Sequence, residues 1–244
     1  MDILYIAGGK DSECQEMLRY SLRGIDKFGH GISRVFISAQ EKPEWLNEEA
    51  IFIPTPRYYS SKAKDIMAAI EHCIRESDID TEFLYSSDDH FYVKDVDFNH
   101  YPYYFRGELP AECKNPDDHY LQHLVDTRSF LSQCNFGTID YSGHVNTHFN
   151  SDIFQKYITA VHKSYDITLY GIEPTCFMLN AMEAERKIDR VFREDIKIAC
   201  ANTYDSITSK IGDNECFSIL SMTMKEAVGE YIRMLFDRKS VFER

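Results

Sequence analysis

The chain has 244 residues, of which 43% are hydrophobic and 14% aromatic, and these are the proportions of an ordinary globular protein with one large domain. Its formal net charge of −13 argues against a general nucleic-acid-binding surface, because contact with phosphates needs lysine and arginine. No apolar run reaches about 18 residues and no basic segment opens the chain, so we expect neither a membrane span nor a secretion signal. Seven scattered cysteines without a C-x-x-C motif predict reduced thiols and a cytoplasmic location.

The first third of the chain alternates short apolar runs with segments of helical periodicity. We expect strands at residues 2–7, 33–38, 50–54 and 82–86. Helices are expected between them at residues 12–28 and 61–76. The order strand, helix, strand, strand, helix, strand predicts an α/β fold with a mostly parallel sheet flanked by helices. Ligands of such sheets bind beyond the carboxyl ends of the strands.

The remaining two thirds are less regular. Residues 95–118 are rich in proline, tyrosine and asparagine and predict a long loop. Two helices are expected at residues 118–133 and 152–163, and the segment between them reads as loop and short strand. Residues 214–238 predict a helical C-terminal part.

Two adjacent carboxylates stand where the fourth expected strand ends. The stretch F-L-Y-S-S-D-D-H-F-Y-V, residues 83–93, places Asp88 and Asp89 directly after apolar residues. Like charges repel, and burying them is costly unless a cation or hydrogen-bond donors lie close by. Such a pair can hold Mg²⁺ or Mn²⁺ against a diphosphate. The alternative is a solvated turn.

A glycine-containing loop follows the first expected strand. In A-G-G-K-D-S, residues 7–12, the backbone amides of Ala7, Gly8 and Gly9 can approach a phosphate, and Lys10 can add charge. Neither the dinucleotide-binding G-x-G-x-x-G pattern nor the P-loop pattern is present.

Four histidines form two pairs with a spacing of four residues. The pairs are His119 with His123, and His144 with His148. Together they allow a zinc site, since imidazole is a common Zn²⁺ ligand. The preferred interpretation is that a single histidine joins the aspartate pair as a third metal ligand.

Two stretches resemble a known family. Residues 16–47, with L-R-Y-S-L-R-G-I-D-K and P-E-W-L-N, are similar to a block of the Stealth family of sugar-phosphate transferases. Residues 83–98 resemble the F-x-Y-x-N-D-D-x-F segment of the same family. Three further stretches, residues 124–135, 143–154 and 167–171, are similar to a pattern in phage-type glycosyltransferase-like proteins.

The resemblance implies a GT-A-like, Rossmann-like domain over residues 1–244. Its expected parts are a nucleotide-sugar-binding half at 1–100, an acceptor-binding and metal-completing half at 101–180, and a helical extension at 181–244. It implies a nucleotide-diphosphate sugar as donor, with UDP as the expected nucleotide, and a divalent metal, Mn²⁺ or Mg²⁺.

By this matching Asp89 is a metal ligand, Asp88 contacts ribose or metal, and His144 is a third ligand. The donor-binding residues are expected to be Ala7, Gly8, Gly9, Lys10, Arg19, Lys64, Ser87 and Asp88.

The chain departs from the family at three places. It has Y-I-A-G-G-K-D-S where Stealth proteins open with Y-T-W-V-D-G-S-D, Ser87 where they have asparagine, and Asn146 where the related pattern has proline. Transfer of the sugar alone is therefore our main hypothesis. Sugar-1-phosphate transfer of the Stealth type, metal-dependent hydrolysis and binding without turnover are the alternatives.

An inverting transferase also needs a base beside the acceptor hydroxyl. Glu173, Asp118 and Asp117 are the candidates, and Glu173 stands in a turn before Pro174. The acceptor is expected to be a glycan hydroxyl or, given the phage-type resemblance, a hydroxylated base in modified DNA. The net negative charge weighs against DNA.

Overall fold

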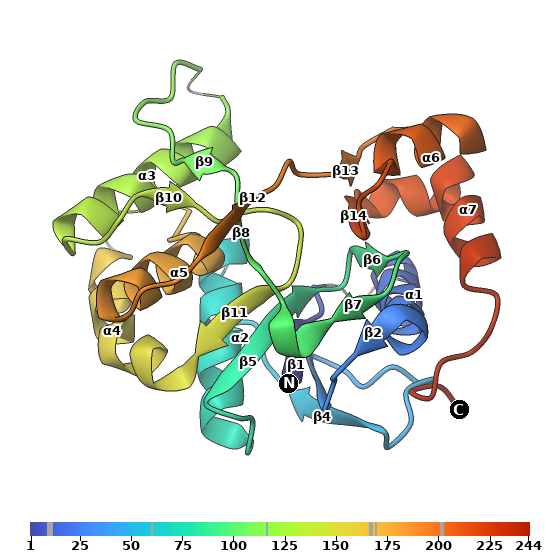
Figure 1. Cartoon of the computed structure of the whole chain (residues 1–244). Coiled ribbons are helices and arrows are strands. Elements are labelled where there is room, and N and C mark those ends of the chain that lie inside the picture. The colour runs from blue at the N-terminus through green and yellow to red at the C-terminus, as the bar shows by residue number, and fades with distance from the viewer. Residues whose placement is uncertain (9–11, 60, 116, 166–167, 169, 201–202) are drawn as a thin grey trace.

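The computed structural model describes residues 1–8, 12–59, 61–115, 117–165, 168, 170–200 and 203–244, and Figure 1 shows its fold. Its centre is a five-stranded sheet in the order β11-β5-β1-β3-β4. The strands are β1 (Asp2–Ile6), β3 (Val35–Ala39), β4 (Ala50–Pro54), β5 (Glu82–Ser87) and β11 (Thr147–Asn150). The first four run parallel, whereas β11 pairs antiparallel with β5. The predicted α/β class is thus confirmed, and the central sheet is mixed, because β11 is antiparallel to its neighbour.

Helices cover both faces of this sheet. Successive strand residues point to opposite faces, so Ile3 and Tyr5 of β1 join one apolar cluster and Leu4 joins another. Helix α1 (Ser12–Phe28) covers the first face, and helix α2 (Lys62–Glu76) covers the second. Both helices were predicted from the 3.6-residue spacing of their apolar side chains.

Three more helices extend the second face. They are α3 (His119–Gln133), α4 (Ser151–Ser164) and α5 (Pro174–Glu185), on the left in Figure 1. Phe149 of β11 contacts Phe154 of α4, and Phe154 contacts Phe177 of α5, with ring centroids 6.3 and 6.1 Å apart. These buried rings tie the middle of the chain to the sheet through β11.

The C-terminal part forms a third apolar cluster, on the right in Figure 1. It contains β13 (Lys197–Ile198), α6 (Tyr204–Ile211), β14 (Cys216–Ile219), the 3₁₀ helix η2 (Ser221–Lys225) and α7 (Ala227–Leu235). The prediction of continuous helix over residues 214–238 was wrong at β14. This strand pairs with β6 (His90–Tyr92), which directly follows the aspartate pair. Pairing with a distant segment decides the conformation here, and local periodicity does not report it.

Residues 95–118 are also more regular than the predicted loop. They contain β7 (Val96–Asp97), the 3₁₀ helix η1 (Phe98–His100), β8 (Tyr103–Phe105) and β9 (Gly107–Glu108). Their partners are β2 (Gly29–His30), β12 (Arg190–Phe192) and β10 (Ile139–Asp140), which pair with β7, β8 and β9 respectively. Among the helices in the described ranges, none has the length and apolar character needed to cross a membrane.

A buried ion-pair cluster fastens the last residues to α1. Glu243, whose side chain is fully buried, receives bonds from Arg23 Nε at 2.6 Å and Arg23 Nη2 at 2.8 Å. The backbone amide of Ser240 donates to the same carboxylate, and Arg19 pairs with it from the next turn of α1. Removing one member of a buried pair leaves the other charge uncompensated, so this cluster is expected to be important for stability.

We therefore expect Glu243→Gln to lower the free energy of unfolding by about 2–3 kcal/mol at pH 7. Burial alone favours the neutral acid, but Arg23, Ser240 and Arg19 together lower the pKa of Glu243 to about 2. The folded-state pKa lies below the unfolded one, so this stabilisation is present above pH 4.5 and disappears as the pH falls toward 2. Urea denaturation of both proteins at pH 7, 4 and 3 checks this. A difference that stays constant over this range contradicts it.

Candidate functional site

A cavity of about 480 Å³ lies at the carboxyl ends of the four parallel strands, and we call it the first cavity. Each strand is followed by a residue that lines it: Gly8 after β1, Gln40 after β3, Arg57 after β4 and Asp88 after β5. The volume is typical of small-molecule and cofactor sites. This is the edge of the sheet at which the sequence predicted a ligand.

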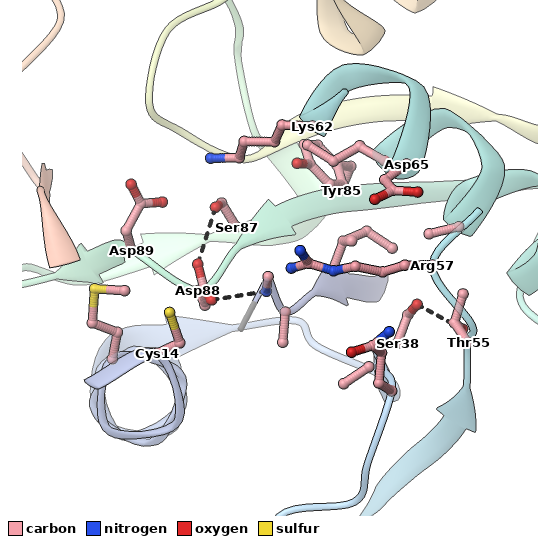
Figure 2. Close-up of a pocket in the computed structure, with 18 of the residues that line it drawn as sticks. Cys14, Ser38, Thr55, Arg57, Lys62, Asp65, Tyr85, Ser87, Asp88 and Asp89 are labelled. Atoms are coloured by element: carbon pink, nitrogen blue, oxygen red, sulfur yellow. Dashed lines mark hydrogen bonds between the residues drawn. The ribbon is translucent and has the colours of Figure 1, made fainter. Parts of the chain in front are cut away.

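Asp88 links the ends of the two central strands (Figure 2). The Gly8 amide donates to Asp88 Oδ2 at 3.1 Å, and the Ser87 hydroxyl donates to Asp88 Oδ1 at 3.4 Å. The Asp88 carboxylate is therefore held in place by its own neighbours. The Gly8 amide, which the sequence assigned to a phosphate, binds this carboxylate in the structure.

Asp89, unlike Asp88, has a carboxylate oxygen without a hydrogen-bond donor among the described residues. Its side chain is only 14% exposed, and Oδ1 is buried with no hydrogen-bond partner among the described residues. Among the described residues, His90 Nε2 lies 3.8 Å from Asp89 Oδ1 and is a group of potential positive charge. A buried carboxylate oxygen without a donor is rare, because it loses its water without replacement. Asp89 thus has an open position for a ligand or cation.

The two aspartates differ in acidity. Burial, reinforced by the neighbouring Asp89 charge, raises the pKa of Asp88 to about 6. Burial also disfavours the charged form of Asp89. Its neighbours favour that form more strongly and hold the pKa of Asp89 below its usual value; they are His90, His144, the Ser87 hydroxyl and Lys62. Burial lowers the pKa of His90 to about 4, so this ring is uncharged at neutral pH. Asp88 is therefore the first of the pair to be protonated, as the pH falls through about 6, whereas Asp89 stays charged to lower pH.

Beside Asp89, three side chains form a chain of hydrogen bonds. Asp195 accepts from the His144 backbone amide at 3.0 Å and from His144 Nδ1 at 2.6 Å. A carboxylate only accepts, so Nδ1 carries the proton and Nε2 of the neutral ring has a lone pair. Lys197 Nζ lies 2.8 Å from this Nε2 and donates to it. The ring nitrogen expected to bind a metal is thus occupied by an ammonium group.

A second cavity of about 460 Å³ adjoins the first. The two share a wall formed by Lys62, Ile66, Tyr85, Ser87, Asp89 and Lys197. The far side of the second cavity comes from α3 and from the start of α5, with Tyr120, His123, Tyr170 and Glu173. Asp89 therefore faces two chambers that together can hold two reactants.

Glu173 is the acidic group at the far side of the second cavity. Its carboxylate is bound by His123 Nε2 at 3.1 Å and by the Thr175 hydroxyl at 3.2 Å. The other ring nitrogen of His123 lies 3.1 Å from the Gly171 carbonyl oxygen. Burial favours the neutral acid, but the bond from His123, its charge and the bond from Thr175 lower the pKa of Glu173. Glu173 is consequently ionised at neutral pH.

The structure brings most of the predicted site residues together, although not all of them. Ala7, Gly8, Ser87, Asp88, Asp89, His144 and Glu173 line one or both cavities. Asp118 instead caps α3 by accepting from the Leu121 amide at 2.9 Å, and it lines neither cavity. The predictions for Gly9 and Lys10 lie outside the described residues.

Two predicted donor-binding cations have other partners. Arg19 pairs with Glu243 and stacks over the ring of Trp45. Lys64 donates to the Tyr165 carbonyl oxygen at 3.1 Å. Among the described residues, the cations that line the first cavity are Arg57, Lys62 and Lys197, which sequence reasoning missed. Lys62 had a local signal, because it opens the helix that follows the third expected strand, whereas Lys197 had none.

The two histidine pairs do not form a zinc site. His148 lies on β11 and binds the Tyr101 carbonyl oxygen at 2.7 Å, whereas His119 contacts the Tyr170 hydroxyl. Within the described part of the chain, no group of three or more His, Cys, Asp or Glu residues is arranged to hold a metal ion. Asp88, Asp89 and His144 therefore do not form a preassembled three-ligand site.

Comparison with known proteins gives no assignment of family or activity: neither a protein-family model nor a curated protein matches this sequence.

Proposed function

We propose that the protein is a metal-dependent glycosyltransferase with a GT-A-like fold, which moves a sugar from a nucleotide-diphosphate sugar to an acceptor hydroxyl. The observation that carries this proposal is the charged Asp89 carboxylate on the wall between two cavities, whose buried Oδ1 has no hydrogen-bond partner among the described residues. A binding protein needs one chamber, whereas a transfer reaction needs two substrates that meet at one point. The resemblance of residues 16–47 and 83–98 to the Stealth family supports the same reaction class.

The first cavity is the proposed donor site. It lies where α/β sheets bind nucleotides, and Arg57, Lys62 and Lys197 supply positive charge for a diphosphate. UDP is the proposed nucleotide. The proposed position of the sugar carbon is near Asp89, because the described residues that line both chambers lie on this wall.

The residues around Asp89 fit a divalent cation. Its Oδ1 lacks a donor, and Mg²⁺ and Mn²⁺ are commonly held by one or two carboxylates together with substrate phosphates. Asp89 and Asp88 are the residues that would hold it, with His144 joining them only if Lys197 leaves its ring nitrogen. When bound, such a cation offsets the negative charge that develops on the leaving diphosphate.

The second cavity is the proposed acceptor site, and Glu173 is the proposed base. The acceptor oxygen forms a bond to the anomeric carbon while the bond from that carbon to the phosphate oxygen breaks. The bonding electrons leave with the diphosphate, and the acceptor proton passes to the Glu173 carboxylate. Tyr120 and Tyr170 give the chamber aromatic walls suited to a ring such as that of a glycan or a flipped base.

A thermal-shift screen tests the donor site directly. We expect UDP or a UDP-sugar to raise the melting temperature in the presence of Mn²⁺, and Asp89→Ala to lose most of this shift. A ligand at about 100 times its dissociation constant adds about 2.7 kcal/mol of stability, which is easily measured. Asp189→Ala, at an exposed aspartate on the surface, is the matched control.

Absence of any shift with all nucleotides and nucleotide sugars contradicts the proposal. A shift followed by release of free sugar without an acceptor identifies a hydrolase, and release of the sugar together with its phosphate identifies transfer of the Stealth type. Product analysis with a panel of glycans and of DNA containing hydroxymethylated bases then identifies the acceptor.

A further inference from the structure

The chain of hydrogen bonds from Asp195 through His144 to Lys197 ends in a charged group on the wall between the two cavities. Lys197 lies on β13, in the C-terminal part of the chain, and lines both chambers. No resemblance or motif points to this residue. Its position raises the question of what an ammonium group does beside the aspartate pair.

The surroundings of Lys197 fix its orientation. His144 is held twice by Asp195, through its backbone amide and through Nδ1, so the ring cannot turn. Nε2 then presents one lone pair, and Lys197 Nζ donates to it at 2.8 Å. An ammonium group has three protons, and this contact uses one of them. The others are available to a ligand in the cavities.

Lys62 is the second cation of this wall. It projects from the first turn of α2, and Figure 2 shows its side chain extended toward the side of the cavity where Asp89 lies. It lines both chambers, as Lys197 does. The positive charge of Lys62 acts to lower the pKa values of Asp88, Asp89 and Lys197. Two like charges near one another favour an anion between them.

Two other roles for Lys62 and Lys197, neutralising the aspartates and stabilising the fold, account less well for the contacts around them. If the lysines only neutralised the aspartates, Asp89 Oδ1 would have a donor, and it has none among the described residues. A purely structural Lys197 would be expected to bury its ammonium group in carboxylate contacts, but it lies against the His144 imidazole, which accepts one proton. The ammonium is thus placed for a ligand that reaches the shared wall.

We propose that Lys197, positioned by His144 and Asp195, forms with Lys62 a diphosphate-binding pair that works without a divalent cation. The inference rests on the proposed function for the identity of the diphosphate. It adds that the protein itself supplies part of the positive charge, so that chelation weakens donor binding without abolishing it. His144 is then a positioning residue for Lys197.

The test is calorimetric titration with inorganic pyrophosphate and with UDP, each in EDTA and in Mn²⁺. The unmodified protein should bind both ligands in EDTA. Lys197→Gln keeps a donor for His144 but removes the charge, and it should weaken pyrophosphate binding in EDTA by about 10- to 100-fold, as expected for one charged hydrogen bond. Lys62→Gln should have a similar effect, and Lys187→Gln, at an exposed lysine paired with Asp189, should have none.

The outcomes separate the inference from the proposed function. Binding of UDP in Mn²⁺ with no binding in EDTA overturns the inference and leaves the transferase proposal standing. The same holds if Lys197→Gln binds pyrophosphate in EDTA as well as the unmodified protein does. Lack of nucleotide binding under every condition overturns both. Lys197→Met, which also removes the donor to His144, provides a second measurement if Lys197→Gln does not fold, and Lys62→Gln provides an independent one.

Discussion

Asp89→Asn is expected to reduce the rate of sugar transfer by about 10²- to 10³-fold, the loss typical when one group that stabilises transition-state charge is removed. The carboxylate has the position, the charge and the open oxygen that a site for a bound cation requires. Asparagine has nearly the same size but no charge. A radiolabelled-donor assay in Mn²⁺, with product separated from free sugar, measures the rate.

The same substitution should change the stability of the fold only slightly. Burial of the Asp89 carboxylate is costly, but the neighbouring groups outweigh this cost and lower its pKa, so the melting temperature of Asp89→Asn should be equal to or slightly below that of the unmodified protein. Asp189→Asn, at an exposed carboxylate, should change neither quantity. If Asp89→Asn keeps full activity, or if it loses activity only by unfolding, Asp89 is not the site of the reaction.

The parts of the fold that could be predicted from sequence are those decided by local pattern. The strands before Gly8 and Asp88 are continuous apolar runs, and α1 and α2 have a clear helical period. Since parallel strands end at a common edge, the sequence placed Gly8, Ser87 and Asp88 together correctly. The sequence left a solvated turn open for the aspartate pair, and the structure shows instead that the side chain of Asp89 is 14% exposed.

The parts that could not be predicted depend on contacts between distant segments. Lys197 reaches the site because β13 pairs with β14, and β14 pairs with β6, which follows Asp89. Nothing within a few residues of Lys197 reports that pairing. Spacing alone was also misleading for His144 and His148, because a four-residue interval brings two side chains together on a helix but not where a loop enters a strand.

The second large effect is expected at Glu173. Glu173→Gln should reduce acceptor-dependent transfer by about 10²- to 10⁴-fold, the usual contribution of a general base. In Glu173→Gln the amide oxygen can accept the bond from His123, and the amide NH2 can donate to the Thr175 hydroxyl, which also accepts, so the second cavity should keep its shape. The amide cannot take the acceptor proton at neutral pH. Initial rates at saturating donor and acceptor, measured together with the dissociation constant of UDP, give the required comparison.

Two controls make the result specific. Asp118→Asn should leave the rate unchanged, because Asp118 lines neither cavity and asparagine caps helices as well as aspartate does. Glu48→Gln, at an exposed glutamate paired with Lys42, controls for the loss of one negative charge. A structural role for Glu173 predicts loss of UDP affinity and of stability along with the rate. A base predicts unchanged UDP affinity with a lost rate, because Glu173 lines only the second cavity and the nucleotide occupies the first.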